Sequence, residues 1–467
     1  MLGKFNINSL TKPLLFFVGV LSFSFASSNV EWSKESFLLC LNKDVNPLTI
    51  NKIENSITVD IDELNDFFNA EGVVDVEPWI PGATDIDRDG DIYLNRIYRV
   101  HVNQERGNDI PLLINKVSKL PFVLYSEFEY LRKPAYSPND PLAESQCTLN
   151  SIKSRKAWDF WNIENGEIPD GSHVLLASVD TGVDYTHPDL QNNAWINQGE
   201  IPSFLFEAGV DTNSDGYIDA AETVAFLIND NYDVNGDGEI NLRDAVSDGS
   251  PFEDGIDSDG NGYIDDLLGW DSSGWYGPDD NDPYPKEGVN PSGTWGHGTH
   301  VAGILAAVTD NDLGMASTSF NAKFISVKVS RENQTGDEPG ISDGYAGITY
   351  AAKAGMYAGS FAIINNSWGG GGYSASENSV INNAQNTYGA IVLSSAGNGY
   401  DSGGEEYGTG YPASYDNCIS VCAIGCSYVW GNWATYHPTV DLAAPGESIY
   451  STVIGSGYDS WDGSSMA

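Results

Sequence analysis

The sequence predicts an α/β protein built on a doubly wound, mostly parallel sheet. From about residue 149, short apolar runs alternate with helical patterns. The runs are continuously apolar, as in strands that are buried on both faces. Strands separated by helices favour a parallel sheet covered on both sides. In such sheets the chemistry gathers at the carboxyl ends of the strands, so polar residues that directly follow a strand are the first candidates for function.

The expected elements follow one another along the chain. The predicted strands are 173–179, 323–329, 361–365, 390–394, 419–424 and 440–443, and the predicted helices are 298–308, 345–356 and 374–386. A small α+β unit precedes them, with strands 97–102 and 122–131 on either side of a helix at 112–120. Residues 135–144 (AYSPNDPLAE) are rich in Pro and Asn and are typical of a linker.

The first 26 residues are typical of a signal peptide. Lys4 and Lys12 supply the positive region, residues 14–25 are apolar, and small residues around Ala26 favour cleavage after it. The alternative is a membrane anchor, although the run is short for a bilayer span. We therefore expect a secreted protein. Residues 27–95 are acidic, show little periodicity and have no assigned role.

Charge narrows the range of partners. Lys and Arg total 22 against 66 Asp and Glu, a formal net charge of -44. Such a surface repels nucleic acid and anionic membranes, so neither is expected as a partner. No later segment is apolar enough for a stable membrane span. Much of the charge is local, because residues 200–290 hold 23 acidic and two basic residues.

The chain has five cysteines, and export permits disulfides. If Cys40 leaves with a pro-segment, the other four allow three pairings. Cys418 and Cys422 lie in one strand-like run, too far apart to bridge each other. The pairing stays open.

Three polar signatures occur in the order Asp, His, Ser. Asp180 ends the first long strand, His297 opens a helix (HGTHVAG), and Ser465 lies in GSSMA. A serine hydroxyl becomes a nucleophile when an imidazole takes its proton, and a carboxylate fixes the imidazole tautomer. Taken alone, Asp180 could be a turn residue at a strand end, His297 a helix cap and Ser465 a loop serine. A metalloprotease is not indicated, because the H-E-x-x-H pattern is absent around His297 and His300.

These motifs resemble those of the subtilisin-like serine peptidases. The resemblance runs from about residue 137 to 467 and includes SPNDPL, VDTGVDYTHPDL, INNSWGG, SSAGN, YPASYDN and DLAAPG. It implies that Asp180 orients the base, that His297 is the general base and acid, and that Ser465 is the nucleophile. It also implies a structural role for His300 and an oxyanion-binding role for the Asn398 amide. Ser464 stands where the family has threonine.

The resemblance further implies a substrate cleft. The expected substrate-binding residues are Ser367, Trp368, Gly369, Ser395, Ala396 and Gly397. Neither segment carries an acidic residue, so cleavage after basic side chains is not indicated. Broad cleavage after apolar or aromatic residues is the family expectation, with protein or peptide substrates as partners.

The upstream α+β unit resembles a subtilisin-type propeptide, which would assist folding and then inhibit the site. We expect cleavage between about Tyr130 and Ser137. The expected organisation is a signal peptide at 1–26, an acidic pro-region at 27–95, a propeptide at 96–134 and a peptidase domain at 135–467. In the family this serine opens a long helix, but only two residues follow Ser465. We therefore expect a C-terminally incomplete peptidase domain that expresses poorly, with activity restored by the missing helix.

Between Asp180 and His297 the chain carries a long acidic insertion, at about residues 200–290, which holds three loops with calcium-ligand spacing. The loop at 211–222 fits the twelve-residue EF-hand pattern throughout, the loop at 233–244 ends in aspartate as in dockerin-like loops, and the loop from 257 has Leu268 at position 12. The expected Ca²⁺ ligands are Asp211, Asn213, Asp215, Tyr217, Asp219, Glu222, Asp233, Asn235, Asp237, Glu239, Asn241, Asp244, Asp257, Asp259 and Asn261. Asp140 and Asp189 match positions near a family calcium site.

Alternatives remain for both features. The acidic segment could be a solvated surface loop, and the paired loops could bind a cohesin-like partner. The whole chain could be an inactive calcium-dependent binding protein on a protease fold, or a processing enzyme with narrow specificity. The leading hypothesis is a secreted, calcium-stabilised endopeptidase, and the complete Asp, His, Ser and Asn set argues against an inactive protein.

Overall fold

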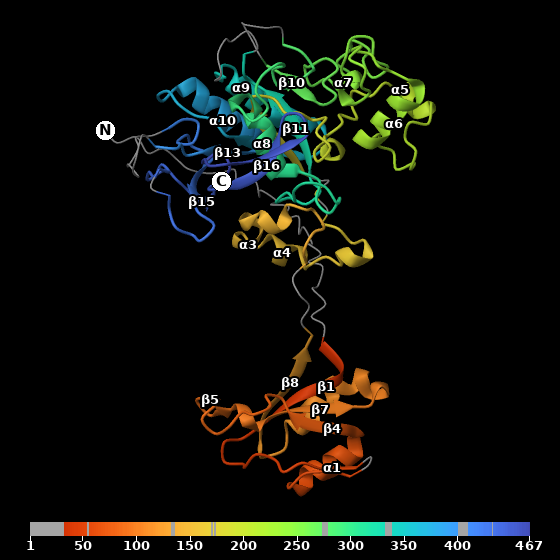
Figure 1. Cartoon of the computed structure of the whole chain (residues 1–467), viewed down its shortest axis with the longest axis vertical. Helices are drawn as coiled ribbons and strands as arrows, with labels where there is room; N and C mark the ends of the chain where they lie inside the picture. Colours follow the sequence, from red (N-terminus) through yellow and green to blue (C-terminus); the bar gives the residue numbers. More distant parts are fainter. Residues whose placement is uncertain are drawn as a thin grey trace, which may run out of the picture. The chain divides into compact units, whose positions relative to one another are not determined.

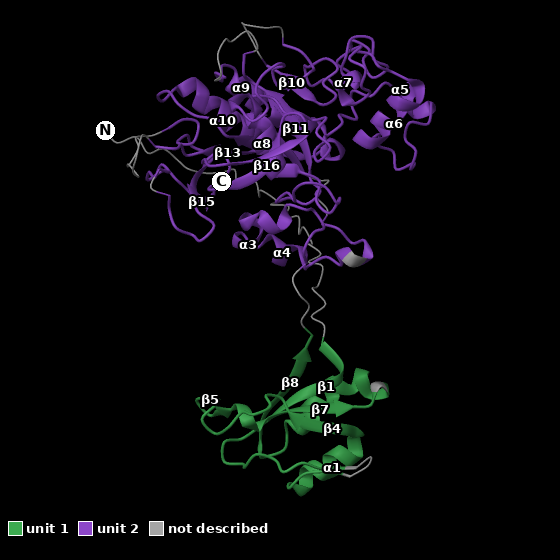
Figure 2. Ribbon diagram, viewed as in Figure 1, with its two compact units in different colours: residues 1–134 green, residues 135–467 purple. Residues whose placement is uncertain are grey.

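The computed structural model divides the chain into two compact units, residues 1–134 and 135–467, which Figure 2 distinguishes by colour. The structure describes residues 32–53, 56–131, 136–169, 171, 174–272, 279–331, 339–399, 410–431 and 433–467. The predicted signal peptide lies outside these residues. No helix within the described ranges is long and apolar enough to cross a membrane.

The first unit is a four-stranded antiparallel sheet with two α-helices. Its strands lie in the order β4 (Val73–Pro78), β7 (Ile97–Val102), β1 (Trp32–Leu41) and β8 (Val123–Tyr130), and its helices are α1 (Asp62–Glu71) and α2 (Ile110–Val117). Phe37 of β1, Leu64 of α1 and Leu113 of α2 are fully buried in one core.

The expected boundary between residues 95 and 96 lies inside this sheet. Strand β1 forms backbone hydrogen bonds with both β7 and β8, and β4 pairs with the other edge of β7. Local periodicity did not reveal β1, because its partners come from more than fifty residues later in the chain. Residues 32–131 therefore form a single folding unit.

The second unit is built on a seven-stranded parallel sheet. Its order is β10 (Gly269–Asp271), β11 (Lys323–Lys328), β9 (Val174–Asp180), β12 (Phe361–Asn366), β13 (Ile391–Ser395), β14 (Cys418–Ile424) and β15 (Leu442–Pro445). Strand β9 is the switch point, because β11 lies on one side of it and β12 on the other. Asp180, its last residue, therefore stands where ligands bind in open α/β sheets.

Helices cover both faces of this sheet, as Figure 1 shows. Helix α8 (His297–Ala306) contributes to the core on one face, and α9 (Gly344–Tyr357) and α10 (Ala375–Tyr388) contribute to the core on the other. This confirms the α/β prediction. The hairpin of β16 (Ile449–Val453) and β17 (Gly457–Trp461) and the short strand β10 were not predicted, and residues 463–467 form turns.

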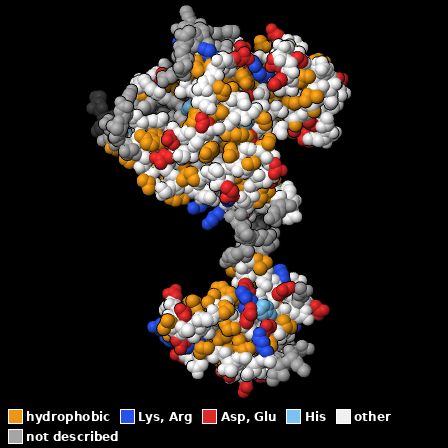
Figure 3. Space-filling view, viewed as in Figure 1, with side chains coloured by type: hydrophobic (Ala, Val, Ile, Leu, Met, Phe, Trp, Pro, Cys, Tyr) orange, Lys and Arg blue, Asp and Glu red, His pale blue; other side chains and the backbone are white. Residues whose placement is uncertain are grey.

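The acidic segment is packed onto the core of the second unit. It contains α5 (Ser203–Glu207), α6 (Ala220–Asp230) and α7 (Leu242–Ala245), which Figure 1 draws in green. Leu205, Leu227 and Leu242 are fully buried in the same core as α8. This burial argues against an unstructured acidic linker. In Figure 3 acidic side chains are spread over the visible face of the second unit, and basic ones are few.

A disulfide joins Cys147 to Cys426, with their Cα atoms 5.9 Å apart. It connects α3 (Cys147–Ser151), near the start of the second unit, to the segment that follows β14. Cys40, Cys418 and Cys422 are buried free thiols. The sequence had left this pairing open.

Candidate active site and acidic loops

Asp180 and His297 are in direct contact. His297 Nδ1 lies 2.8 Å from Asp180 Oδ1, and the Asp180 carboxylate is buried while the imidazole is partly exposed. The Thr181 backbone amide donates to the same carboxylate oxygen at 2.8 Å. These two donors hold the carboxylate in the orientation that fixes the imidazole tautomer, with Nε2 left for chemistry.

The local sequence allows the first turn of α8 to approach Asp180 closely. A Cβ atom on Gly298 would lie 2.3 Å from the Gly182 carbonyl oxygen, so no larger residue fits there. The Thr181 hydroxyl donates to the Trp295 carbonyl and accepts from the Gly298 amide. Thr181 and Gly298 thus hold the end of β9 against the start of α8.

The environments of the two histidines differ. Burial by itself lowers the pKa of His297, but the charge and hydrogen bond of Asp180 outweigh burial and raise that pKa above its ordinary value. His300 is fully buried, and its desolvation lowers its pKa to about 4. Its ring stacks on Trp461 with centroids 4.4 Å apart. His300 is therefore neutral and forms part of the packing.

Ser465 lies in the turn after β17. Its hydroxyl donates to the Ser367 carbonyl at 3.1 Å, and the Ser367 hydroxyl donates to the Ser465 carbonyl at 3.0 Å. The next residue, Met466, packs in a small cluster with Val301 of α8. The turn is thus packed against the helix that carries His297, although the hydroxyl is engaged with Ser367 and not with the imidazole.

Asn398 lies beside this turn. Its amide oxygen accepts from the Ser464 amide and from the Ser464 hydroxyl, both at 2.8 Å. Because the oxygen is held on that side, the NH₂ group points away from Ser464 and can donate elsewhere. Gly397 and Gly399, on either side, have φ values of 109° and 53°, which favour glycine.

All six expected substrate-binding residues surround one cavity of about 350 Å³. Its lining also includes Ser465 and Asn398. No charged side chain occurs among the lining residues that the structure describes. Trp368, on its wall, donates from its indole nitrogen to the Val179 carbonyl at 2.8 Å, immediately before Asp180. The cavity wall is thereby tied to the end of β9.

The first two acidic loops have the same internal hydrogen-bond pattern. In the loop at 211–222, the Glu222 carboxylate accepts from the amides of Thr212 (2.8 Å) and Asp219 (3.2 Å). In the loop at 233–244, the Asp244 carboxylate accepts from the amides of Val234 (2.7 Å) and Asn241 (2.9 Å). In both loops, the residue at position 12 folds back across the loop and brings its carboxylate toward the other acidic residues.

The third loop has no acidic residue at position 12, and the carboxylate of Glu200 takes that place. Leu268, at position 12, is buried in the core because the chain continues there into β10. The Glu200 carboxylate instead accepts from the amides of Asp259 (2.9 Å) and Asp265 (3.1 Å), positions 3 and 9 of the loop. Sequence analysis missed Glu200, because it lies 57 residues before the loop begins and no spacing rule covers such a distance.

Buried acidic groups gather around the third loop. One carboxylate oxygen from each of Glu200, Asp259 and Asp266 lies within 4.8 Å of the others. Burial raises the pKa of Asp266 to about 8. In the first loop, Asp211 Oδ1 is buried and has no hydrogen-bond partner among the described residues. Oxygen donors at this density suit a hard divalent cation such as Ca²⁺.

Asp140 and Asp189 are also buried and close enough for their charges to interact. Burial raises the pKa of Asp189 to about 6. Its carboxylate accepts from the Asn311 amide at 2.8 Å and from the Met315 backbone amide at 2.9 Å, while Asp140 accepts from the Asp310 amide.

Comparison with known proteins defines the class. Residues 171–467 match the family model described as the subtilase family. Thermitase from Thermoactinomyces vulgaris is 30% identical over 333 residues, which cover 71% of this chain and 81% of that protein. The extracellular basic protease of Dichelobacter nodosus is 27% identical over 373 residues, covering 76% of this chain but only 50% of that protein. A solved protease from Pseudoalteromonas arctica PAMC 21717 aligns with a TM-score of 0.43 and 23% identity, covering 71% of this chain and 84% of that chain.

The class is therefore that of the serine peptidases, in which an imidazole activates a hydroxyl nucleophile. Within this class the chain belongs to the subtilase family and is a subtilisin-like serine endopeptidase, a hydrolase of peptide bonds. Its seven-stranded parallel sheet with helices on both faces is the α/β fold expected of that family.

Proposed function

We propose that this chain is a secreted endopeptidase that cleaves peptide bonds with Asp180, His297 and Ser465 through an acyl-enzyme. The observation that carries the proposal is the 2.8 Å contact between His297 Nδ1 and the buried Asp180 carboxylate. That contact leaves Nε2 as the base, and its orientation is fixed before substrate arrives. Secretion is supported by the N-terminal sequence and by the similarity to an extracellular protease, that of Dichelobacter nodosus.

In the proposed reaction, Ser465 Oγ leaves the Ser367 carbonyl and donates to His297 Nε2. As the hydroxyl attacks the scissile carbonyl, its proton passes to His297, and Asp180 stabilises the imidazolium. The oxyanion accepts hydrogen bonds from the Asn398 amide and the Ser465 backbone amide. His297 then protonates the leaving amine, the acyl group stays on Ser465, and a water molecule activated by His297 releases it.

The cavity beside Ser465 supports a preference for apolar or aromatic side chains before the scissile bond. The described lining offers no carboxylate to pair with Lys or Arg, and a buried unpaired charge would be costly. Glycines and small polar residues leave room for a large side chain.

We propose that the first unit is the propeptide, and that it assists folding and inhibits the site until it is cleaved from the peptidase. Its self-contained core supports a separately folding unit. The cleavage expected between Tyr130 and Ser137 falls partly on residues 132–135, which lie outside the described ranges.

We also propose that the three acidic loops hold Ca²⁺, with Glu200 completing the third. The unpartnered buried oxygen of Asp211 and the closely spaced carboxylates around Glu200 fit a cation. Bound Ca²⁺ would neutralise side chains that otherwise repel one another, and would thereby fix the insertion on the core.

Labelling of the full-length protein with a fluorophosphonate tests the enzymatic proposal. We expect the label on Ser465, and no label after Ser465→Ala or after denaturation. The Ser465→Ala protein should also keep its first unit uncleaved in a host free of other proteases. An unlabelled Ser465 would favour the inactive calcium-binding protein instead.

A further inference from the structure

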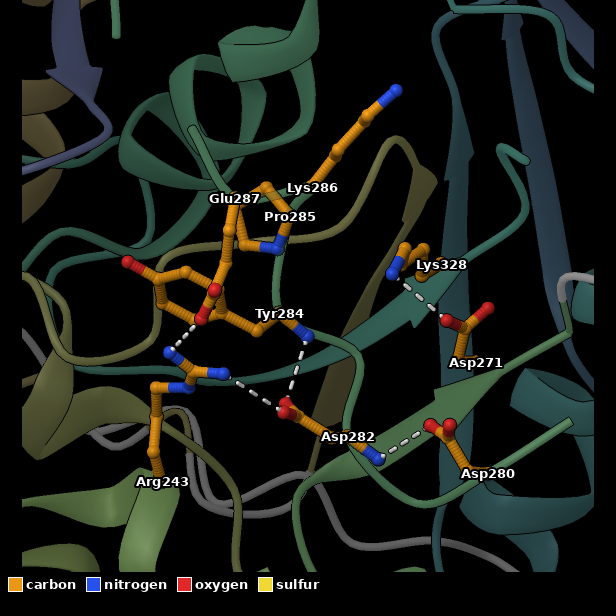
Figure 4. A pocket seen from close by; sticks show the side chains of 9 residues that line it. All are labelled: Arg243, Asp271, Asp280, Asp282, Tyr284, Pro285, Lys286, Glu287 and Lys328. Atoms are coloured by element: carbon orange, nitrogen blue, oxygen red, sulfur yellow. Dashed lines mark hydrogen bonds and ion pairs between the residues drawn. The ribbon is translucent and has the colours of Figure 1, made fainter. Parts of the chain in front are cut away.

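Arg243 connects the second acidic loop to residues 280–287, the part of the insertion nearest to His297. It lies in α7, next to Asp244, the last residue of the second acidic loop. Its guanidinium forms ion pairs with Glu287 at 2.6 Å and with Asp282 at 3.4 Å, and it stacks on the Tyr284 ring at 4.3 Å. Figure 4 shows these side chains converging from α7 and from residues 280–287.

Residues 282–285 in turn support the end of β9. The Pro283 carbonyl accepts from the Val183 backbone amide at 3.2 Å and from the Ser326 hydroxyl at 3.1 Å. A Cβ on Gly182 would lie 2.8 Å from that carbonyl oxygen, so the two backbones are in close contact. Gly182 and Val183 lie two and three residues after Asp180, so a shift of this segment would reach the carboxylate through a short stretch of backbone.

The same segment reaches both sides of the Asp180–His297 pair. The Asp282 carboxylate accepts a hydrogen bond from the buried hydroxyl of Tyr185, five residues after Asp180. The ammonium group of Lys286 lies 4.7 Å from the centre of the Trp295 ring, two residues before His297.

On one side of residues 282–287, the contacts of Arg243 take the place of apolar packing. A cavity of about 440 Å³ lies here, and its lining includes Arg243, Tyr284 and Glu287 (Figure 4). Among the residues that the structure describes, none fills this space with apolar packing against the segment. The two ion pairs and the stacking contact of Arg243 bridge the space, and the planar guanidinium makes all three at once.

We propose that Arg243 is a positioning residue for peptide-bond hydrolysis, acting through residues 282–287 on the alignment of Asp180 with His297. The inference rests on the proposed role of those two residues. It also gives the insertion a function in catalysis, because α7 presents Arg243 only while the second loop is folded.

The test compares Arg243→Met and Arg243→Lys with wild type in the full-length protein. The control is Arg155→Met, which removes an arginine with a similar 2.8 Å carboxylate contact, to Glu144, and a similarly low exposure. Active sites are counted by fluorophosphonate labelling, and kcat and KM are measured per labelled site on a chromogenic peptide. Melting temperatures are recorded for every variant.

We expect Arg243→Met to lower kcat by about tenfold with KM changed less than about twofold, as misalignment of reacting groups does. Arg243→Lys, which keeps the charge, should recover part of the loss. Arg155→Met should lower the melting temperature and leave kcat per labelled site unchanged. If Arg243→Met kept the wild-type kcat, or if Arg155→Met lost as much kcat as Arg243→Met, the inference would be overturned while the proposed function would stand. Failure to label wild type at Ser465 would overturn the proposed function and the inference together.

Discussion

Glu200 Oε1 accepts a hydrogen bond from the Asp259 backbone amide at 2.9 Å, and its other oxygen accepts from the Asp265 amide at 3.1 Å. Glu222 binds the amides of positions 3 and 9 in the first loop in the same way. A carboxylate from before the insertion helices therefore replaces the missing last residue of the third loop. The start of the acidic insertion meets the third loop at this point, and the calcium site that we propose for that loop would draw on both.

We predict that Glu200→Gln weakens Ca²⁺ binding at the third loop by about tenfold or more, because the twelfth-position carboxylate supplies two ligand oxygens in loops of this kind. Calorimetric titration of chelator-treated protein should show one tight site fewer than wild type. Glu207→Gln, an exposed glutamate of α5, is the matched control and should bind as wild type does. The same number of sites and the same affinities in Glu200→Gln would show that the third loop does not use this residue.

Calcium removal should also lower the melting temperature of wild type, by an amount that grows with the Ca²⁺ concentration of the reference sample. Asp211→Ala combined with Asp233→Ala should reduce that dependence, since each removes the first residue of a loop. Hydrogen exchange should localise the loosening to residues 205–270. A melting temperature independent of Ca²⁺ would mean that the loops are only acidic structure.

Asp180→Asn should lower kcat by about 10⁴-fold, because the amide favours the wrong imidazole tautomer. The pH profile gives a second readout. Asp180 raises the pKa of His297 above its ordinary value, and the protonated imidazole cannot act as a base, so wild-type kcat/KM should fall on the acid side at a higher pH than an ordinary imidazole would give.

In Asp180→Asn the burial of His297, which lowers its pKa, is no longer opposed by the Asp180 charge, so the acidic limb of the residual activity should move to lower pH. Asp462→Asn, which removes an exposed carboxylate near Ser465, serves as the control and should leave the limb in place. Identical limbs in wild type and Asp180→Asn would argue against His297 as the base.

Asn398→Asp separates the two ends of the Asn398 side chain. It keeps an oxygen to accept from Ser464 but loses the NH₂ donor, so the loop should hold while the oxyanion loses a hydrogen bond. We expect kcat to fall by about 10²–10³-fold with little change in KM, for Asn398→Asp as for Asn398→Ala. Steady-state kinetics on one peptide substrate decides this, and an unchanged kcat in both variants would remove Asn398 from oxyanion binding.

The Cys147–Cys426 bond closes a loop with a sequence separation of 279 residues. Replacing both cysteines by alanine should lower the free energy of unfolding by about 2–5 kcal/mol, since the unfolded chain regains its freedom. Urea unfolding measures this, with Cys422→Ala as a control that removes a thiol but no cross-link. Wild type in reducing agent should match the double variant. Stability equal to wild type in the double variant would contradict the prediction.

Acid should weaken the first unit. The pKa of Glu71 is lowered, first by its hydrogen bond to Lys116, and that of Glu77 is lowered, first by its hydrogen bond to Arg99. A depressed acidic pKa stabilises the folded form above the unfolded value of 4.5, and this stabilisation is lost as the pH falls below it. Hydrogen exchange of residues 32–131 in Ser465→Ala should therefore accelerate below about pH 4.5, and less steeply after Glu71→Gln. Exchange independent of pH, after correction for the intrinsic rate, would exclude this.

The sequence by itself determined the order of the main strands and helices in the second unit and the residues that stand at strand ends. It did not reveal β10, the β16–β17 hairpin or the helices of the acidic segment. Continuous apolar runs and helical periodicity are local properties, so β9, β11 and α8 were predicted within two residues of their bounds. The order of the motifs along the chain indicated Asp180, His297 and Ser465, although the sequence gives no distances between their side chains. The same local rules found the first two acidic loops, because all their positions lie within twelve residues.

Only the tertiary structure decided the relationships between distant segments. Strand β1 is defined by partners at β7 and β8, Glu200 completes a loop that begins 57 residues later, and Cys147 pairs with one of several possible cysteines. The role that we propose for Arg243 depends on the ion pairs that join α7 to Asp282 and Glu287, which no local pattern predicts. Each of these contacts joins residues that lie far apart in the sequence, and no periodic pattern links them. The packing of the whole unit therefore selects the partner.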